Sequence, residues 1–396
     1  MTLVEKFTGG AKAMSIAGIV GLAGLALTAL GFVVSPAEAW NSYLLGFTYW
    51  CGISVATIIM ISIFHTAKAK WVTILRRAME GMAVPVAVFA LLFVPIALVG
   101  LRHLYAWHTP PASYTPAELH HLAHKQHGYL NVPFFLVRQV IYFAVWIFVS
   151  HKLFGLSRRQ DANGELDYTV RLRRVGPASL PFLALTITFA AFDWLMSLTP
   201  LWHSTIYGAY YFAGSFLAAF ALLTVITVNA RGTHAYGNLV TTAHFHSLGK
   251  LLLAFTAFWA YIGFSQFLLV WIANLPEEVP WYHVRIIGPW RPFSIALFFA
   301  HFVLPFFTLL SRDIKLKPRL LAVVAVYLLV VHALDLYWLI WPSLHPEGPT
   351  FHWTLVTAFL GVGGVGVAYG LYRVRGGYSL PVKDPYIGES LRYVQP

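Results

Sequence analysis

The sequence predicts an all-α polytopic membrane protein with about ten transmembrane helices, and three observations support this fold class. Hydrophobic residues make up 58% of the 396 residues and charged residues only 11%, whereas soluble domains carry about 25% charged residues. The mean hydropathy is +0.68. The apolar residues form separate runs, and each reaches the length of about 20 residues that a helix needs to cross about 30 Å of hydrocarbon.

These runs give ten predicted spans in order. We treat the first run as a full span, because it is longer than the apolar stretch of a secretory signal peptide. The whole chain, 1–396, is predicted to form a single integral membrane domain, with a cytoplasmic tail over 373–396. The predicted spans are 14–34, 42–64, 82–101, 132–154, 179–198, 207–228, 248–271, 292–311, 319–342 and 352–372.

The basic residues are distributed asymmetrically between the loops. When Lys152 and Arg319 at the span ends are counted with the adjoining loops, 21 of the 27 Lys and Arg residues lie on one side, four lie on the other side and two lie inside spans. Cytoplasmic loops of membrane proteins carry such an excess, so we predict that both termini are cytoplasmic. The same topology explains the net charge of +12 without nucleic acid as a partner.

The chain has a single cysteine, Cys51. One cysteine excludes disulfides within the chain and iron–sulfur clusters held by several cysteines, and the Cys-x-x-Cys-His attachment motif of c-type haem is absent. We therefore expect neither a covalent haem nor a cluster in this chain.

Ionisable residues inside the spans are the first candidates for function, because a charge facing hydrocarbon costs about 2.5–3.5 kcal/mol on insertion scales. Asp193, in FAAFDWLMSL, lies in the outer half of the fifth span, and Arg138 lies at similar depth in the fourth. We predict that Asp193 faces the interior of a helix bundle with Arg138 as its ionic partner. A purely structural pair and a position on a proton path are both open interpretations.

The ninth span carries His332 and Asp335 three residues apart, hence on one helical face, and the eighth carries His301. His203 follows the fifth span at its outer mouth. Asp and His side chains inside a bundle can pass on protons, so these residues and Asp193 form a candidate proton path. A hydrogen-bonded core cluster, or a b-type haem between His301 and His332, are the alternatives.

Two histidine-rich segments lie nearer the membrane surfaces. The segment TTAHFHSLGKLLLAF opens the seventh span and supplies a candidate cytoplasmic entry for protons, although its lysine can also simply extend to the interface. The outer segment ELHHLAHKQH places three histidines on one face of a helix; we favour a polar, partner-facing surface over a metal site, because further ligands are lacking. The residues are Lys250, His244 and His246 in the first segment and His120, His124 and His127 in the second.

Two longer segments resemble a known family. They are FDWLMSLTPLWHSTIYGAYYFAGSFLAAFALL (192–223) and LGKLLLAFTAFWAYIGFSQFLLVWIANLPEEVPWY (248–282). Both resemble the NrfD-like membrane subunits of alternative complex III, the bacterial quinol:cytochrome c oxidoreductase. The layout of spans and the short tail resemble the shorter of its two NrfD-like subunits. The resemblance implies two four-helix bundles, from spans two to five and six to nine, flanked by spans one and ten.

The resemblance also implies a place in the bacterial cytoplasmic (inner) membrane and a set of partners. These are multihaem and monohaem cytochrome c subunits, which hold haem c, an iron–sulfur subunit with its clusters, the longer NrfD-like quinol-binding subunit, other small membrane subunits and lipids. For this chain it implies scaffolding and a proton half-channel in support of quinol oxidation, with no cofactor assigned to the chain itself. Bound menaquinone or ubiquinone is an open alternative.

Three other functions stay open on the sequence. A stand-alone proton-coupled transporter is expected to show broken helices at corresponding places in two halves. A cytochrome b-like subunit is expected to show a haem spectrum. A structural scaffold is expected to keep proton coupling unchanged when Asp193 or Asp335 is replaced by Asn.

Overall fold

The computed structural model describes residues 6–395, so positions 1–5 and 396 of the predicted domain and tail lie outside the described residues. Within 6–395 every regular element is helical, apart from one isolated bridge between Lys6 and Tyr378. The elements are α1 (Ala11–Val34), α2 (Pro36–Thr66), η1 (Trp71–Leu75), α3 (Arg76–Ala83), α4 (Val86–Pro95), η2 (Ile96–Gly100), α5 (Leu101–Leu104), α6 (Pro116–Gly128), α7 (Val132–Asn163), α8 (Leu166–Trp194), η3 (Met196–Leu198), α9 (Tyr207–Ala230), α10 (Thr242–Ala273), α11 (Val279–Ile286), α12 (Arg291–Phe298), η4 (Phe299–Val303), α13 (Leu304–Leu310), α14 (Arg312–Leu316), α15 (Pro318–Ile340), η5 (Trp341–Ser343), α16 (Thr354–Val374) and α17 (Ile387–Leu391).

Ten of these helical segments in the described part are long and apolar enough to cross a membrane, which indicates a multi-pass membrane protein. Each one overlaps a predicted span. Most of the segments are longer than the predicted spans, and the difference is largest for three of them: the third segment starts at Trp71, α7 continues to Asn163 and α8 starts at Leu166. Hydropathy marks the part of a helix that suits hydrocarbon, whereas the helix ends where its cap forms, as at Gly164 in the left-handed conformation (φ 77°).

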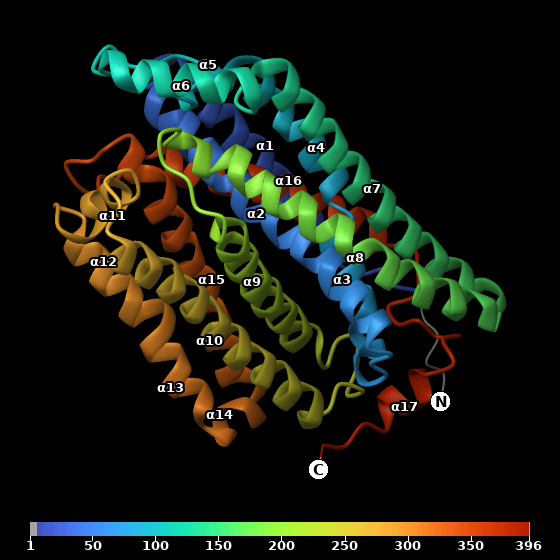
Figure 1. The fold of residues 1–396 in the computed structure, drawn as a ribbon. Coiled ribbons are helices and arrows are strands. Elements are labelled where there is room, and N and C mark those ends of the chain that lie inside the picture. Colours follow the sequence, from blue (N-terminus) through green and yellow to red (C-terminus); the bar gives the residue numbers. More distant parts are fainter. Residues whose placement is uncertain (1–5, 396) are drawn as a thin grey trace.

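Helix α2 lies at the centre of the molecule, and 94% of its most apolar window is buried. It packs on α4 and α8, which both pack on α7; we call these four the first helix group. Helix α9 packs on α10 and α15, and α10 packs on η4 and α13; with α12, these are the second helix group. The two groups meet where α9 contacts α2 and α8, as Figure 1 shows with α9 between the blue-green and the orange helices.

Helices α1 and α16 form a closely packed pair beside α2. A Cβ on Gly24 would lie 2.6 Å from the Thr357 carbonyl oxygen and 2.7 Å from the Gly361 nitrogen. Only glycine permits this approach of the two backbones, as in other membrane helix pairs joined by small residues. The exposed apolar side chains of α1, such as Ile19 and Leu22 at 68% each, then face away from the protein.

Both described ends of the chain lie at one end of the helix groups (Figure 1). The Phe7 amide donates to the Gly377 carbonyl at 2.7 Å. The tail crosses the same end, where Asp384 pairs with Arg76 at 2.7 Å and the Ser390 hydroxyl donates to the Trp71 carbonyl at 2.6 Å. Assignment of this end to the cytoplasm rests on the distribution of basic residues and stays a prediction.

Two spans contain a π-helical turn, η2 and η4. Turn η4 precedes Pro305, which has no N–H to donate to the carbonyl of His301 and whose ring would clash with it in an α-helix. The wider turn relieves this conflict, and such turns are frequent at functional sites. His301 therefore lies in a locally altered backbone, buried at 0% exposure.

Candidate functional site

Two buried carboxylates stand at comparable places in the two helix groups. Asp193 lies near the end of α8 and Asp335 near the end of α15, with 0% and 1% exposure. A short 3-10 turn follows each helix. A proline occurs seven residues after each Asp and a histidine ten residues after it (Asp193, Pro200, His203; Asp335, Pro342, His345). The surroundings of the two carboxylates nevertheless differ.

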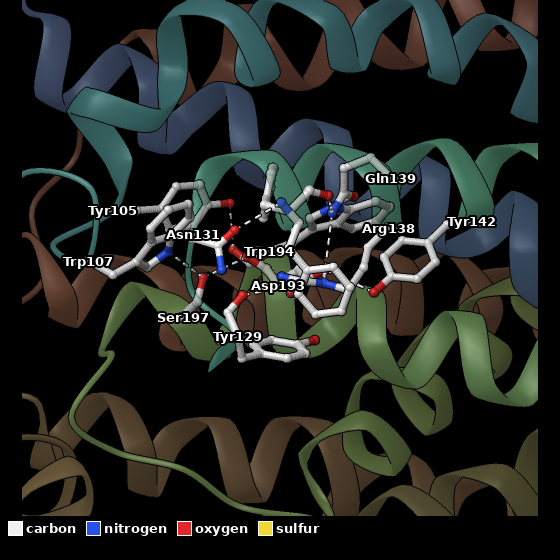
Figure 2. A network of polar contacts seen from close by, with 12 residues as sticks. Tyr105, Trp107, Tyr129, Asn131, Arg138, Gln139, Tyr142, Asp193, Trp194 and Ser197 are labelled. Atoms are coloured by element: carbon white, nitrogen blue, oxygen red, sulfur yellow. Dashed lines mark hydrogen bonds and ion pairs between the residues drawn. The ribbon is translucent and has the colours of Figure 1, made fainter. Parts of the chain in front are cut away.

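Asp193 is held by a two-pronged ion pair with Arg138. Its Oδ2 accepts from Arg138 Nε at 2.9 Å and its Oδ1 from Arg138 Nη2 at 2.8 Å, as Figure 2 shows. Arg138 also donates to the Tyr129 carbonyl at 3.1 Å and lies over the rings of Tyr129 and Phe134 at 3.8 and 4.3 Å. The parallel geometry matches the planar guanidinium fork, and the charge of Asp193 is balanced by a permanent cation.

Neutral donors complete the shell of Asp193. Its Oδ2 also accepts from Gln139 Nε2 at 3.1 Å and from the Tyr142 hydroxyl at 2.9 Å. The Gln139 amide oxygen in turn accepts from Trp194 Nε1 at 2.8 Å. With four donors on two oxygens, Asp193 has a fixed set of contacts, and this network joins α7 to α8.

The Asp193 network extends to the loop after α5 (Figure 2). Ser197 donates to the Asp193 carbonyl at 2.6 Å, and Trp107 Nε1 donates to the Ser197 hydroxyl at 3.2 Å. The Tyr105 hydroxyl donates to the Trp194 carbonyl at 3.2 Å. Burial, and then the nearby Asp193 charge, raises the pKa of Tyr105 well above its usual range, so this hydroxyl keeps its proton and ties the loop to α8.

Asp335 has fewer partners, and none is a permanent cation. Its Oδ1 accepts from the Tyr210 hydroxyl at 2.5 Å, and its Oδ2 accepts from Trp259 Nε1 at 3.1 Å. Among residues 6–395 its one ion-pair partner is His332, whose Nδ1 lies 3.8 Å from Oδ2. Since His carries a charge only when protonated, charge balance at this site depends on a proton.

His301 and His332 extend the Asp335 site. Their ring centroids are 6.3 Å apart, and the His301 ring lies 3.9 Å from that of Trp259. None of their four ring nitrogens has a hydrogen-bond partner within the described part of the chain. Buried polar atoms are nearly always satisfied, so these nitrogens mark a place in the second helix group where a water molecule or a transferred proton can bind.

Arg285, on α11 beside the second helix group, is a buried cation that does not contact Asp335. Its side chain donates to the carbonyls of Trp338, Trp281 and Leu339 at 3.3, 3.0 and 3.1 Å. It also lies over the Trp281 ring at 3.7 Å. Burial lowers the pKa of Arg285 to about 9, so the group keeps its charge at neutral pH and caps the carbonyl end of α15.

The structure gathers only part of the predicted proton path. His301, His332 and Asp335 share one site, whereas Asp193 belongs to the Arg138 network and His203 is exposed in the loop before α9. At the predicted cytoplasmic entry, Lys250 is exposed, but His244 is buried beside the Tyr393 ring and His246 contacts Gln395. The C-terminal tail therefore contacts two of the three predicted entry residues. A proton-conducting role for the entry residues and for the residues of the predicted path stays a prediction.

Sequence reasoning missed the aromatic donors of both sites. Tyr210 and Trp259 belong to two helices other than that of Asp335, and the chain has 20 Tyr and 14 Trp. Sequence spacing therefore does not distinguish these two donors from the other aromatic residues.

In the outer segment α6, the three predicted histidines are exposed (His120, His124 and His127). Across the described residues no three His, Cys, Asp or Glu side chains are placed to hold a metal ion.

In comparisons with known proteins, no family model and no curated protein matches the chain.

Proposed function

We propose that this chain is a membrane subunit of a respiratory quinol:cytochrome c oxidoreductase of the alternative complex III type, and that its second helix group exchanges protons at Asp335, His332 and His301. The observation that carries the proton role is a buried carboxylate whose only ionic partner within residues 6–395 is a histidine. Two buried imidazoles beside it have unpartnered nitrogens. The family assignment rests on the resemblance of 192–223 and 248–282.

The charge argument separates the two carboxylates. An unpaired buried charge is strongly disfavoured, and Arg138 meets this demand for Asp193 at all pH values near neutral. At Asp335 the demand is met only by a proton, either on the carboxyl group itself or on His332. A proton that arrives at His301 or His332 as another leaves from Asp335 keeps the net charge of the site unchanged. We therefore place the exchangeable proton in the second helix group and treat Asp193 as a structural pair.

In this proposal the chain forms two four-helix bundles in the bacterial cytoplasmic membrane, with both termini in the cytoplasm. Cytochrome c subunits would dock on the opposite side, where α6 presents its exposed histidines. Quinol oxidation itself would occur in the longer NrfD-like partner beside an iron–sulfur subunit. The present chain would scaffold that complex and supply the proton half-channel.

The assembly part of the proposal is tested by gentle detergent extraction of the native protein, followed by a native gel, subunit mass spectrometry and a reduced-minus-oxidised spectrum of the same band. We expect the chain to migrate with c-type cytochromes and an iron–sulfur subunit. A colourless band that contains this chain alone would contradict the assignment.

The proton part is tested with Asp335→Asn in native membranes, by measuring protons moved per electron during quinol oxidation. We expect this ratio to fall while electron transfer continues, because Asn accepts the Tyr210 hydrogen bond but carries no exchangeable proton. Asp313→Asn, a change at an exposed carboxylate on α14, is the matched control. An unchanged ratio in both variants would favour a structural scaffold.

One observation favours a second candidate, a stand-alone proton-coupled transporter. The π-helical turns η2 and η4 each interrupt a candidate span, one in each helix group, and interrupted spans are typical of transporters. The two turns lie in non-corresponding helices, the second span of the first group and the third of the second. For this reason we rank the transporter behind the respiratory subunit.

A further inference from the structure

A crevice of about 570 Å³ lies in the second helix group, between α9, α10, α11, α12 and α15. This volume is typical of sites that hold one small molecule or one lipid chain. Half of the residues that line it are aromatic, and these include Trp259, Phe264, Phe267, Phe298, Phe299 and Trp338. None of the side chains that line it is acidic.

The crevice opens sideways, toward the space that the bilayer occupies. Phe264 on α10 is 60% exposed, and Ile295 and Phe299 on the α12 side are 49% and 55% exposed. All three lie inside candidate membrane spans. Large apolar side chains with this exposure at this depth contact hydrocarbon, so an occupant would enter from the membrane.

The end of the crevice near α11 is polar. Gln266 is 4% exposed, and its amide group interacts with the Tyr282 side chain, while its Oε1 accepts no hydrogen bond within residues 6–395. Arg291, the first residue of α12, is exposed, lines the crevice and has no ion-pair partner in the described part. This end of the crevice therefore offers the Arg291 cation at the membrane surface. Deeper in, it offers the buried Gln266 amide oxygen, which lacks a hydrogen-bond donor.

We infer that this crevice binds one anionic phospholipid with a hydroxyl-bearing headgroup. Arg291 would contact the phosphate, as basic residues at membrane surfaces do, and a headgroup hydroxyl would donate to Gln266. One acyl chain would follow α10 from Gln266 to Trp259, seven residues or about 10 Å at 1.5 Å per residue. This inference rests on the crevice alone and holds whether or not the proposed respiratory function is correct.

The lipid chain would have a consequence for the Asp335 site. Tyr210 and Trp259 both donate to Asp335, and both line the crevice. A bound acyl chain covers these two side chains on the membrane side. It would therefore close the Asp335 site to water from that direction.

The experiment uses the purified full chain, first delipidated and then exposed to equimolar phosphatidylglycerol and phosphatidylcholine, with native mass spectrometry to count bound lipids. We expect one phosphatidylglycerol to be retained in preference to phosphatidylcholine. Arg291→Gln should reduce that preference about fivefold, the effect expected for one basic residue near an anionic lipid. Arg102→Gln, a change at an exposed arginine on α5, outside the second helix group and predicted to lie near the same membrane surface, should leave it unchanged.

A second variant addresses the crevice itself. Ala260 lines it on α10, so Ala260→Phe should fill the space and abolish retention of either lipid. If that variant fails to fold, the comparison of Arg291→Gln with Arg102→Gln still decides the matter. Equal retention of the two lipids by the wild-type chain, or equal losses in both arginine variants, would show only general surface attraction and overturn the inference.

Discussion

The first and second helix groups each bury one carboxylate near the end of their last helix, but they balance its charge in opposite ways. Asp193 accepts from four donor atoms, two of them on the permanent cation Arg138, whereas Asp335 has two neutral donors and a histidine at 3.8 Å. The first arrangement fixes the charge and joins two helices. The second leaves the charge dependent on a proton. The difference shows that an intramembrane carboxylate identifies a functional site only when its partners are known.

The largest expected effect comes from breaking the fixed pair. Arg138→Ala should lower the free energy of unfolding by about 3–5 kcal/mol, because it leaves Asp193 buried without a cation. Thermal unfolding in detergent or a denaturant titration measures this. Asp335→Asn should cost far less, since no permanent ion pair is lost. Similar losses in the two variants would remove the distinction between the groups.

A smaller effect is expected from crowding the histidine of the second site. A Cβ on Gly214 would lie 2.8 Å from Cε1 and 3.0 Å from Nδ1 of His332, so Gly214→Ala should cost about 1–3 kcal/mol of stability and displace the imidazole. Gly155→Ala is the control, because nothing lies within 4 Å of its Cβ position. If Gly214→Ala matches Gly155→Ala in unfolding temperature and in proton coupling, the close contact between the Gly214 position and the His332 ring is contradicted.

The two tyrosines give a direct comparison of the carboxylates. Hydrogen bonds to charged groups contribute about 1.5–3 kcal/mol and those to neutral groups about 0.5–1.5 kcal/mol. If the proton of the second site lies on Asp335 and not on His332, Tyr142→Phe, at the charged Asp193, should therefore cost more stability at neutral pH than Tyr210→Phe, at Asp335. Tyr142 and Tyr210 are 4% and 7% exposed, so the two changes are matched in burial. The reverse order would indicate that Asp335 carries the more permanent charge.

The smallest effect is expected at His203. Its side chain is exposed in a loop, and substitutions at such positions are usually within about 0.5 kcal/mol. His203→Gln should leave stability and proton coupling unchanged. A loss of coupling with unchanged stability would restore His203 to the proton path and extend the site toward the first helix group.

The sequence allowed the spans and the ionisable pairs to be predicted, because both depend on features that single residues carry. Hydropathy locates the helices, and intramembrane Asp193 and Arg138 at similar depth in consecutive spans indicate a contact. The helical spacing of His332 and Asp335 likewise places them on one face. Each of these inferences uses residue type and position along a helix, without knowledge of which helices meet.

The rest depends on how distant helices pack. Trp259, on α10, reaches Asp335 on α15 because both helices pack with α9, and no local pattern encodes that meeting. From the sequence, Arg285 is simply one of the four basic residues predicted on the outer side. In the structure it is buried at the end of α15 and donates to three backbone carbonyls. The contacts of the C-terminal tail with His244 and His246 could not be predicted from the sequence either. They involve polar residues of the tail that follow no helical or strand periodicity.

The tail that crosses the end of the helix groups also sets an order of events during synthesis. Arg76 is buried at 8% exposure, and its one ion-pair partner in the described chain is Asp384. More than 300 residues separate Arg76 from Asp384 in the sequence. More than 300 residues also separate Phe7 from Gly377, whose carbonyl accepts a hydrogen bond from the Phe7 amide. Most of the chain has been translated and inserted before either contact can form. That end of the protein therefore closes last, and until then it is accessible to chaperones, proteases and assembling partners.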